Sequence, residues 1–190
     1  MVEQLHTLLG SAGVEGPYIL GGHSLGGMNM LVFANRFPGE VAGVVLVDSA
    51  HPDQYDRLSA VLPKPAPGEN AVVASLRKEF AWINPADQSF PEPMNWTETL
   101  AQVRAVKSLG SLPLAVLVAV DTAKSHWVNA PPDVAASLDK VWLDLHQEYT
   151  SLSTDSTLIL ARNSGHFIQS DEPQVVVDAI LGLVDKARKK

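Results

Sequence analysis

Residues 18–28 read Tyr18-Ile19-Leu20-Gly21-Gly22-His23-Ser24-Leu25-Gly26-Gly27-Met28. An apolar run typical of a buried strand ends at a pair of glycines, and a helix-forming segment begins after the serine. Gly22-His23-Ser24-Leu25-Gly26 matches the Gly-x-Ser-x-Gly pattern of a nucleophile elbow, a sharp strand-to-helix turn that holds a strained serine clear of the sheet. Gly22 and Gly26 are expected where a Cβ would clash with the turn. We therefore predict that Ser24 is a nucleophile.

A helix that begins at Leu25 would direct its first backbone N–H groups, and the positive end of its dipole, at charge developing beside Ser24. The N–H of Leu25 is therefore the predicted first donor of an oxyanion hole. The alternative is a glycine-rich turn with an ordinary serine. We favour the nucleophile because the required strand precedes the pattern and a helix-like segment follows it.

Composition restricts the classes of function. The chain has 190 residues, 46% of them hydrophobic, and a net charge of −7, which suits one globular domain and argues against a nucleic-acid surface. The basic residues cluster only at 186–190, where they complement a helix end. No apolar run reaches the roughly 18 residues of a membrane span, and the first residues lack signal-peptide features. With no cysteine, disulfides are excluded, and we expect a cytoplasmic protein.

Strand and helix patterns alternate along the chain. Strands are predicted over 17–21, 41–47, 112–120 and 157–161, and helices over 2–10, 25–37, 95–110, 134–149 and 173–184. The strands are apolar throughout, which is typical of a parallel sheet covered on both faces. The predicted fold is therefore α/β, a parallel sheet with helices on both faces.

Residues 51–110 differ from the rest because prolines interrupt the pattern repeatedly. We predict a cap or lid insertion over 51–110, with one short helix near 71–80, and a core made of 1–50 and 111–190. Three aromatic residues lie within the insertion: Trp82, Phe90 and Trp96. They line an apolar acyl site or pack in a core, and the sequence does not choose between these two interpretations.

A serine nucleophile needs a base within hydrogen-bond reach. Of the six histidines, His166 fits best, because it follows the C-terminal end of a predicted parallel strand, at the sheet edge where open α/β sheets collect functional groups. His51 and His126 lie in loops near strand ends and are candidate substrate contacts. The other three, at 6, 23 and 146, are interpreted as surface, structural or packing residues.

The base in turn needs a carboxylate that fixes its tautomer and stabilises the imidazolium. Asp48 and Asp121 both end predicted parallel strands. Either could be the acid, and either could be a plain cap at a strand end. The pattern alone leaves both open.

Three motifs together resemble the α/β-hydrolase fold family in its ester-hydrolase branches. They are Gly22-His23-Ser24-Leu25-Gly26-Gly27, Val45-Leu46-Val47-Asp48-Ser49-Ala50 and Ser164-Gly165-His166. The resemblance covers essentially the whole chain and implies Ser24 as nucleophile, His166 as general base and Leu25 as oxyanion donor. The acid of the family usually follows the strand over 113–120, often in a Gly-x-x-Asp turn that is absent around Asp121. Some members place the acid one strand earlier, so we prefer Asp48.

The same family normally carries about four strands and an oxyanion loop before the elbow, whereas only 23 residues precede Ser24. The resemblance thus implies an N-terminally truncated hydrolase whose strand 17–21 becomes a sheet edge. Such an edge is expected to promote self-association into a homo-oligomer.

The resemblance implies a serine hydrolase that cleaves a carboxylic ester or a similar acyl compound through a Ser-His-Asp triad, with a small-molecule ester as partner. Neither a cofactor nor a metal is expected, and neither nucleic acid nor membrane. A perhydrolase would use the same triad. The alternative from another class is an inactive hydrolase-like module that acts by binding or self-association.

Overall fold

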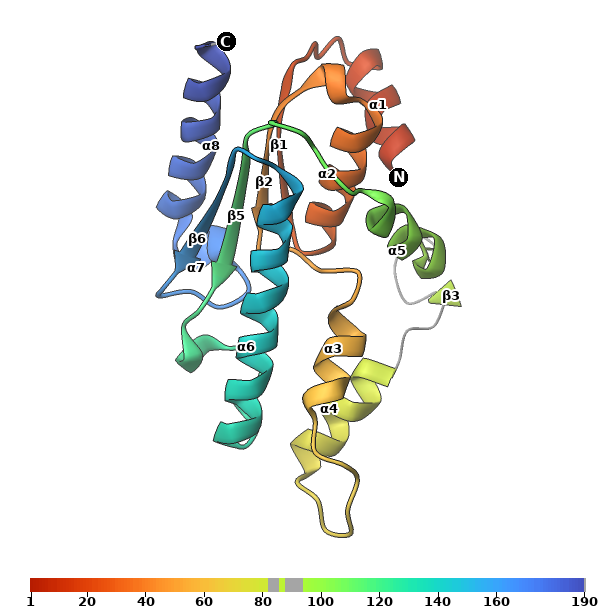
Figure 1. Ribbon diagram of the computed structural model, residues 1–190, viewed down its shortest axis with the longest axis vertical. Helices are drawn as coiled ribbons and strands as arrows, with labels where there is room; N and C mark the ends of the chain where they lie inside the picture. Colours follow the sequence, from red (N-terminus) through yellow and green to blue (C-terminus); the bar gives the residue numbers. More distant parts are fainter. Residues whose placement is uncertain (82–85, 88–93, 190) are drawn as a thin grey trace.

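The computed structural model describes residues 1–81, 86–87 and 94–189. Its main sheet has four parallel strands in the order β1-β2-β5-β6 (Figure 1). The strands are β1 Tyr18–His23, β2 Val41–Val47, β5 Leu114–Ala119 and β6 Ser156–Ala161. A short antiparallel pair is formed by β3 Ala86–Asp87 and β4 Met94–Asn95. The predicted parallel α/β sheet is confirmed.

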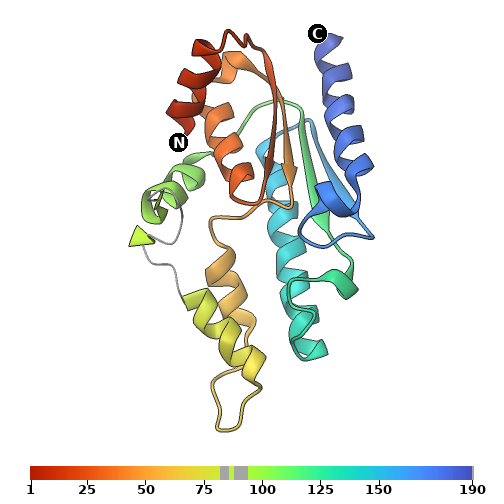
Figure 2. The same ribbon diagram turned by 180° about the vertical axis from the view of Figure 1, so that it is seen from behind.

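Helices cover both faces of the sheet (Figures 1 and 2). The helices α7 Ile168–Asp171 and α8 Pro173–Arg188 lie on one face, and α2 Leu25–Arg36 and α6 Pro132–Tyr149 lie on the other. Successive residues of β2 divide between the two layers, since Val44 clusters with Phe33 of α2 whereas Val45 clusters with Leu183 of α8. A strand buried on both sides therefore needs the continuous apolar run seen in the sequence.

Two further helices flank α2. α1 Val2–Ser11 packs Leu5 and Leu9 against the cluster that contains Phe33, but Leu8, predicted on the same face, is 62% exposed. α5 Trp96–Ala105 begins where predicted, with the Asn95 side chain accepting from the N–H of Glu98, and ends at Ala105, short of residue 110. Short 3-10 turns lie at Pro38–Glu40, Thr122–Lys124 and Thr150–Leu152.

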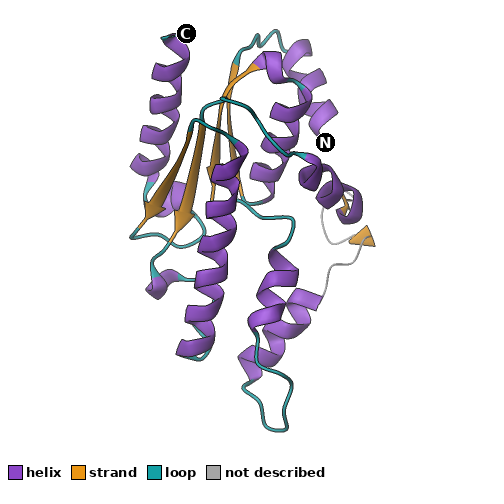
Figure 3. Ribbon diagram, viewed as in Figure 1, coloured by secondary structure: helices purple, strands orange, loops and turns teal. Residues whose placement is uncertain are grey.

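The remaining helices extend beyond the C-terminal ends of the strands (Figures 1 and 3). α4 Ala71–Ala81 matches the predicted short helix, whereas α3 Gln54–Val61 was not predicted. Leu58 of α3, Leu76 of α4 and Leu138 of α6 share one buried cluster. α5, in contrast, contributes to the cluster of α2 and the sheet. The division into a core and a 51–110 insertion stays a prediction.

Of the three aromatic residues for which an acyl site and core packing were both left open, Trp82 and Phe90 lie outside the described residues. Trp96 is partly buried against the apolar cluster around α2, which agrees with the packing interpretation.

β1 lies at the edge of the sheet, as predicted. Self-association through that edge stays a prediction. Across the described ranges, no helix combines the length and the apolar character needed to cross a bilayer.

Candidate active site

The turn between β1 and α2 has the strained geometry of an elbow. Ser24 has a φ of 53° and immediately precedes the first residue of α2, a backbone region that residues with a side chain rarely adopt. A Cβ on Gly22 would lie 2.5 Å from the carbonyl carbon of Gly26. The clash predicted at Gly26 itself is wrong, because a Cβ there meets open space. After Ser24, the glycine without room for a side chain is the next one, Gly27, whose Cβ would lie 2.2 Å from Ser49 Oγ.

The elbow is bonded to the end of the neighbouring strand. The Ser24 N–H donates to Val47 O at 3.1 Å, and Ser24 O accepts from the Ala50 N–H at 3.0 Å. Ser49 Oγ donates to the same Ser24 carbonyl at 3.3 Å. The loop after β2 is therefore fixed against the backbone of the predicted nucleophile.

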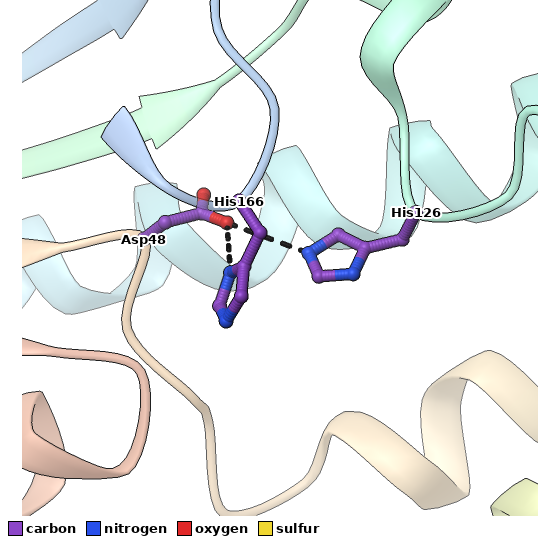
Figure 4. Close-up of side chains that lie close together, drawn as sticks. All are labelled: Asp48, His126 and His166. Carbon is purple, nitrogen blue, oxygen red and sulfur yellow. Dashed lines mark hydrogen bonds and ion pairs between the residues drawn. The ribbon is translucent and has the colours of Figure 1, made fainter. Parts of the chain in front are cut away.

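Asp48 lies between these contacts and is fully buried. It has a φ of 41°, a second left-handed non-glycine residue on the same rim; such strain is concentrated at functional sites. Its Oδ1 accepts from Trp142 Nε1 and from the Ala119 N–H, both at 3.0 Å. Its Oδ2 accepts from His166 Nδ1 at 2.8 Å (Figure 4). Each donor comes from a different part of the fold.

The surroundings of Asp48 favour its ionised form. Burial disfavours the charge, but the side chains of His126 and His166, the field of His146 and the Ala119 N–H together hold the pKa of Asp48 well below its usual range. A permanently charged carboxylate facing His166 Nδ1 fixes the tautomer in which Nδ1 carries the proton. The other ring nitrogen, Nε2, points away from Asp48 (Figure 4) and is left to accept a proton.

His166 is held from two sides. Its carbonyl accepts from His23 Nε2 at 2.9 Å, and the two rings lie 4.4 Å apart; the residue before Ser24 thus touches the residue predicted as its base. On the other side, a Cβ on Gly165 would lie 2.5 Å from Lys124 O, so the turn packs tightly on the loop after β5. Among the described residues, none of the hydrogen bonds joins Ser24 Oγ to His166. In the unliganded forms of such sites that bond is often long.

Asp121, the other candidate acid, lies near the same rim, but among the described residues it makes no hydrogen bond or ion pair to a histidine. Its carboxylate accepts from the Ala123 N–H at 3.0 Å and closes the turn at 122–124. Leu25 is the first residue of α2, directly after Ser24, as predicted.

The other histidines divide into two groups. His6 stacks on Phe37 and faces Glu40, which directly precedes β2, whereas Asp48 follows the other end of that strand. His51 is buried after β2, where its Nδ1 accepts from the Asp53 N–H at 3.2 Å. His126 and His146 face Asp48 directly, with Nε2 at 3.6 Å from Oδ2 and at 3.7 Å from Oδ1, respectively.

His146 is the histidine that sequence reasoning placed least well. It is fully buried, and its Nδ1 donates to Trp142 O at 2.8 Å. Burial lowers its pKa, although Asp48 opposes the shift. His146 follows Trp142 by four residues, which puts both side chains on one face of α6. This spacing was the signal in the sequence that could have placed His146 beside Trp142.

A cavity of about 260 Å³ opens beside His166 on the side of α6. It is lined by aromatic, aliphatic and charged side chains, among them Lys124, His126, Trp127, Asp139, Trp142 and His166. His126 and His166 therefore both reach its surface.

The sequence model of the alpha/beta hydrolase family matches residues 2–179. A protein of Bacillus subtilis, named uncharacterized protein YqjL, is 26% identical over 181 residues, which are 94% of this chain and 61% of that protein. A protein of Fusarium pseudograminearum, named thioesterase, is 39% identical over 84 residues, 42% of this chain and 33% of that protein. The chain thus spans about three fifths of the first relative and one third of the second.

Among solved structures, a crystal structure described as a probable hydrolytic enzyme of Pseudomonas aeruginosa is similar with a TM-score of 0.56 and 18% identity. The match covers 96% of this chain and 67% of that one. At this identity the similarity shows a shared fold.

Proposed function

Because the chain belongs to the alpha/beta hydrolase family, we propose that it hydrolyses a carboxylic ester or thioester through an acyl-enzyme on Ser24. The observation that carries this proposal is the 2.8 Å hydrogen bond from His166 Nδ1 to the fully buried, ionised Asp48, beside the strained elbow. A buried carboxylate paired with imidazole beside a strained serine is the arrangement that makes serine a nucleophile.

The steps follow from these positions. Ser24 Oγ attacks the acyl carbon while His166 Nε2 takes its proton, and Asp48 stabilises the imidazolium. The Leu25 N–H, at the N-terminus of α2, donates to the oxyanion. His166 then protonates the leaving alcohol or thiol, and the acyl-enzyme forms. A water molecule, deprotonated by His166, releases the acid and restores Ser24.

Two observations support an acyl substrate over other substrates of the fold. The nucleophile position holds serine, whereas aspartate at the elbow serves epoxide and haloalkane chemistry. A relative that shares 84 aligned residues is named a thioesterase, and a thioester presents the same acyl carbon to Ser24.

A fluorophosphonate probe tests the proposal, because it labels only an activated serine. We expect one probe per chain, found on Ser24 by peptide mass spectrometry, and hydrolysis of p-nitrophenyl acetate and acetyl thioesters. Ser24→Ala should abolish both. Ser170→Ala, an exposed serine near His166 in sequence, is the matched control and should be labelled like the wild type.

Folded protein that is neither labelled nor active would contradict the proposal and favour a hydrolase-like binding module. Labelling of Ser24 combined with peracid formation from acetate and hydrogen peroxide would instead assign a perhydrolase, which uses the same triad.

A further inference from the structure

Two imidazole nitrogens converge on one carboxylate oxygen of Asp48. His166 Nδ1 lies 2.8 Å from Asp48 Oδ2, and His126 Nε2 lies 3.6 Å from the same oxygen. All three side chains offer ligand atoms within 4.8 Å of one another. Figure 4 shows the two imidazoles approaching the carboxylate from different loops. A serine triad needs only one of these histidines, so His126 is unexplained by the proposed reaction.

We propose that Asp48, His126 and His166 form a binding site for Zn²⁺ or a similar divalent transition metal ion. Two imidazoles and one carboxylate are a common protein donor set for zinc. Ligand atoms about 2.1 Å from a tetrahedral ion lie about 3.4 Å apart. The 2.8 Å and 3.6 Å separations lie on either side of that value. The two imidazole nitrogens lie within 4.8 Å of each other, so rotations of the two histidine side chains would bring the three ligand atoms to tetrahedral spacing.

The carboxylate is prepared for such a ligand. Its Oδ1 keeps the hydrogen bonds from Trp142 Nε1 and the Ala119 N–H, which hold the group in place. Among the described residues, Oδ2 accepts a hydrogen bond from His166 Nδ1. The ion takes the Nδ1 lone pair when the neutral imidazole exchanges this proton for one on Nε2. His146 faces Oδ1 on the opposite side and is not part of the proposed ligand set.

His126 supplies the third ligand from a position that is packed against aromatic rings and reached by solvent. Its ring lies 5.4 Å from Trp127, 5.4 Å from Trp142 and 4.5 Å from His166. Its side chain is 33% exposed, and the cavity of about 260 Å³ reaches both His126 and His166. An ion can therefore approach from solvent and retain water as a fourth ligand.

Metal binding at this site inhibits the reaction, a consequence that rests on the proposed function. An ion on Nδ1 separates His166 from Asp48 and leaves the imidazole proton on Nε2, which can then no longer accept the proton of Ser24. The ion is thus a reversible inhibitor. Binding itself does not depend on activity and can be measured alone.

The test uses the full chain after EDTA treatment and dialysis. Zn²⁺ is titrated by calorimetry, and Co²⁺ is added to record the visible absorption of a low-symmetry imidazole–carboxylate site. We expect one ion per chain, with binding at least about tenfold weaker in His126→Ala. His6→Ala is the matched control, since His6 faces one carboxylate, Glu40, without a second imidazole at that pair; it should bind Zn²⁺ like the wild type.

Equal Zn²⁺ affinity of His126→Ala and wild type, in proteins with the same thermal midpoint, overturns the proposed site, as does absence of binding up to millimolar Zn²⁺. If His126→Ala is unfolded, His126→Asn provides the same comparison. Where esterase activity is measurable, inhibition by Zn²⁺ is expressed relative to each variant's own metal-free rate and should be weaker in the His126 variant. An inactive protein that binds Zn²⁺ in this pattern would refute the hydrolase proposal and leave the metal site standing.

Discussion

Two aspartates end neighbouring parallel strands, Asp48 after β2 and Asp121 after β5, and their surroundings differ. Asp48 is fully buried and accepts hydrogen bonds from Trp142, Ala119 and His166. Asp121 is half-buried and accepts from the N–H of Ala123, two residues on. The first is bound by tertiary structure, and the second closes its own turn.

The difference shows that position at a strand end does not by itself give a carboxylate a function. The ionised form of Asp48 persists without solvent only because N–H groups of three separate segments face it. Asp121 has water available and a local partner. Substitutions at Asp48 and at Asp121 should therefore differ in which property they reduce, activity or stability, and in the size of the loss.

The largest contrast is expected from asparagine at each position. Asp48→Asn removes the charge that stabilises the His166 imidazolium and permits the wrong tautomer, so kcat/KM for p-nitrophenyl acetate should fall roughly 10³- to 10⁴-fold. Asp121→Asn keeps the acceptor for Ala123 and should change kcat/KM less than about twofold. Equal losses in the two variants, with matching circular dichroism, would remove the distinction between the two aspartates.

The loops after the two aspartates also differ, which gives the second contrast. His51, after Asp48, is only 7% exposed. Burial lowers its pKa to about 4, although Asp53 and Glu148 oppose the shift. The unfolded chain takes up this proton near pH 6.5 and the folded chain only near pH 4. Stability is therefore lost as the pH falls through this window, by up to about 3 kcal/mol.

Urea unfolding between pH 7 and pH 4 measures this loss. His51→Asn offers an oxygen to the Asp53 N–H in place of Nδ1 and should show a shallower decline than the wild type. His51→Ala, without that acceptor, should be less stable at pH 7 yet equally shallow. A decline as steep in both variants as in the wild type would assign the acid sensitivity to other groups, such as the half-buried His23 and the buried His146, whose pKa values burial also lowers.

The sequence predicted the parts of the molecule that depend on local pattern. Val41–Val47 could be bounded as a strand because its apolar run has abrupt ends, and Ser24 stood out because the elbow fixes glycines at short spacing. The order of strand ends also placed His166 and Asp48 on one edge. Ser24, His166 and Asp48 as a catalytic set stay a prediction until labelling and activity are measured.

What the sequence could not predict depends on residues that meet only after folding. Trp142 and Ala119 lie 94 and 71 residues from Asp48, and no local pattern links them to it. The helix α3 was missed because prolines dominate its surroundings and its apolar face is short. Gly27 was missed because its neighbour, Ser49 Oγ, belongs to another strand end.

The third contrast concerns the side-chain N–H group that Trp142 donates to Asp48. Trp142→Phe removes the Nε1–H that donates to Asp48 Oδ1 at 3.0 Å and leaves a buried charge short of one hydrogen bond. We expect a loss of about 2 kcal/mol in the free energy of unfolding. Trp127→Phe is the matched control, since its ring meets Trp142 edge-on at 6.0 Å and none of the described hydrogen bonds of Asp48 involves it. Similar losses in both variants would point to lost packing rather than to the missing donor.

The smallest effect is expected at Asp121, where two substitutions separate the role of the acceptor oxygen from the role of the charge. Asp121→Ala deletes the acceptor for the Ala123 N–H, an exposed contact at 3.0 Å, and should cost about 0.5–1 kcal/mol of stability. Asp121→Asn retains the acceptor and should cost less than about 0.5 kcal/mol. Thermal unfolding of the two variants measures the difference. Asparagine would thus serve at 121, where only an acceptor is needed, and fail at 48, where the charge is needed. If Asp121→Asn were instead as damaging as Asp121→Ala, the charge would matter at both strand ends, and burial would no longer explain why the two aspartates differ.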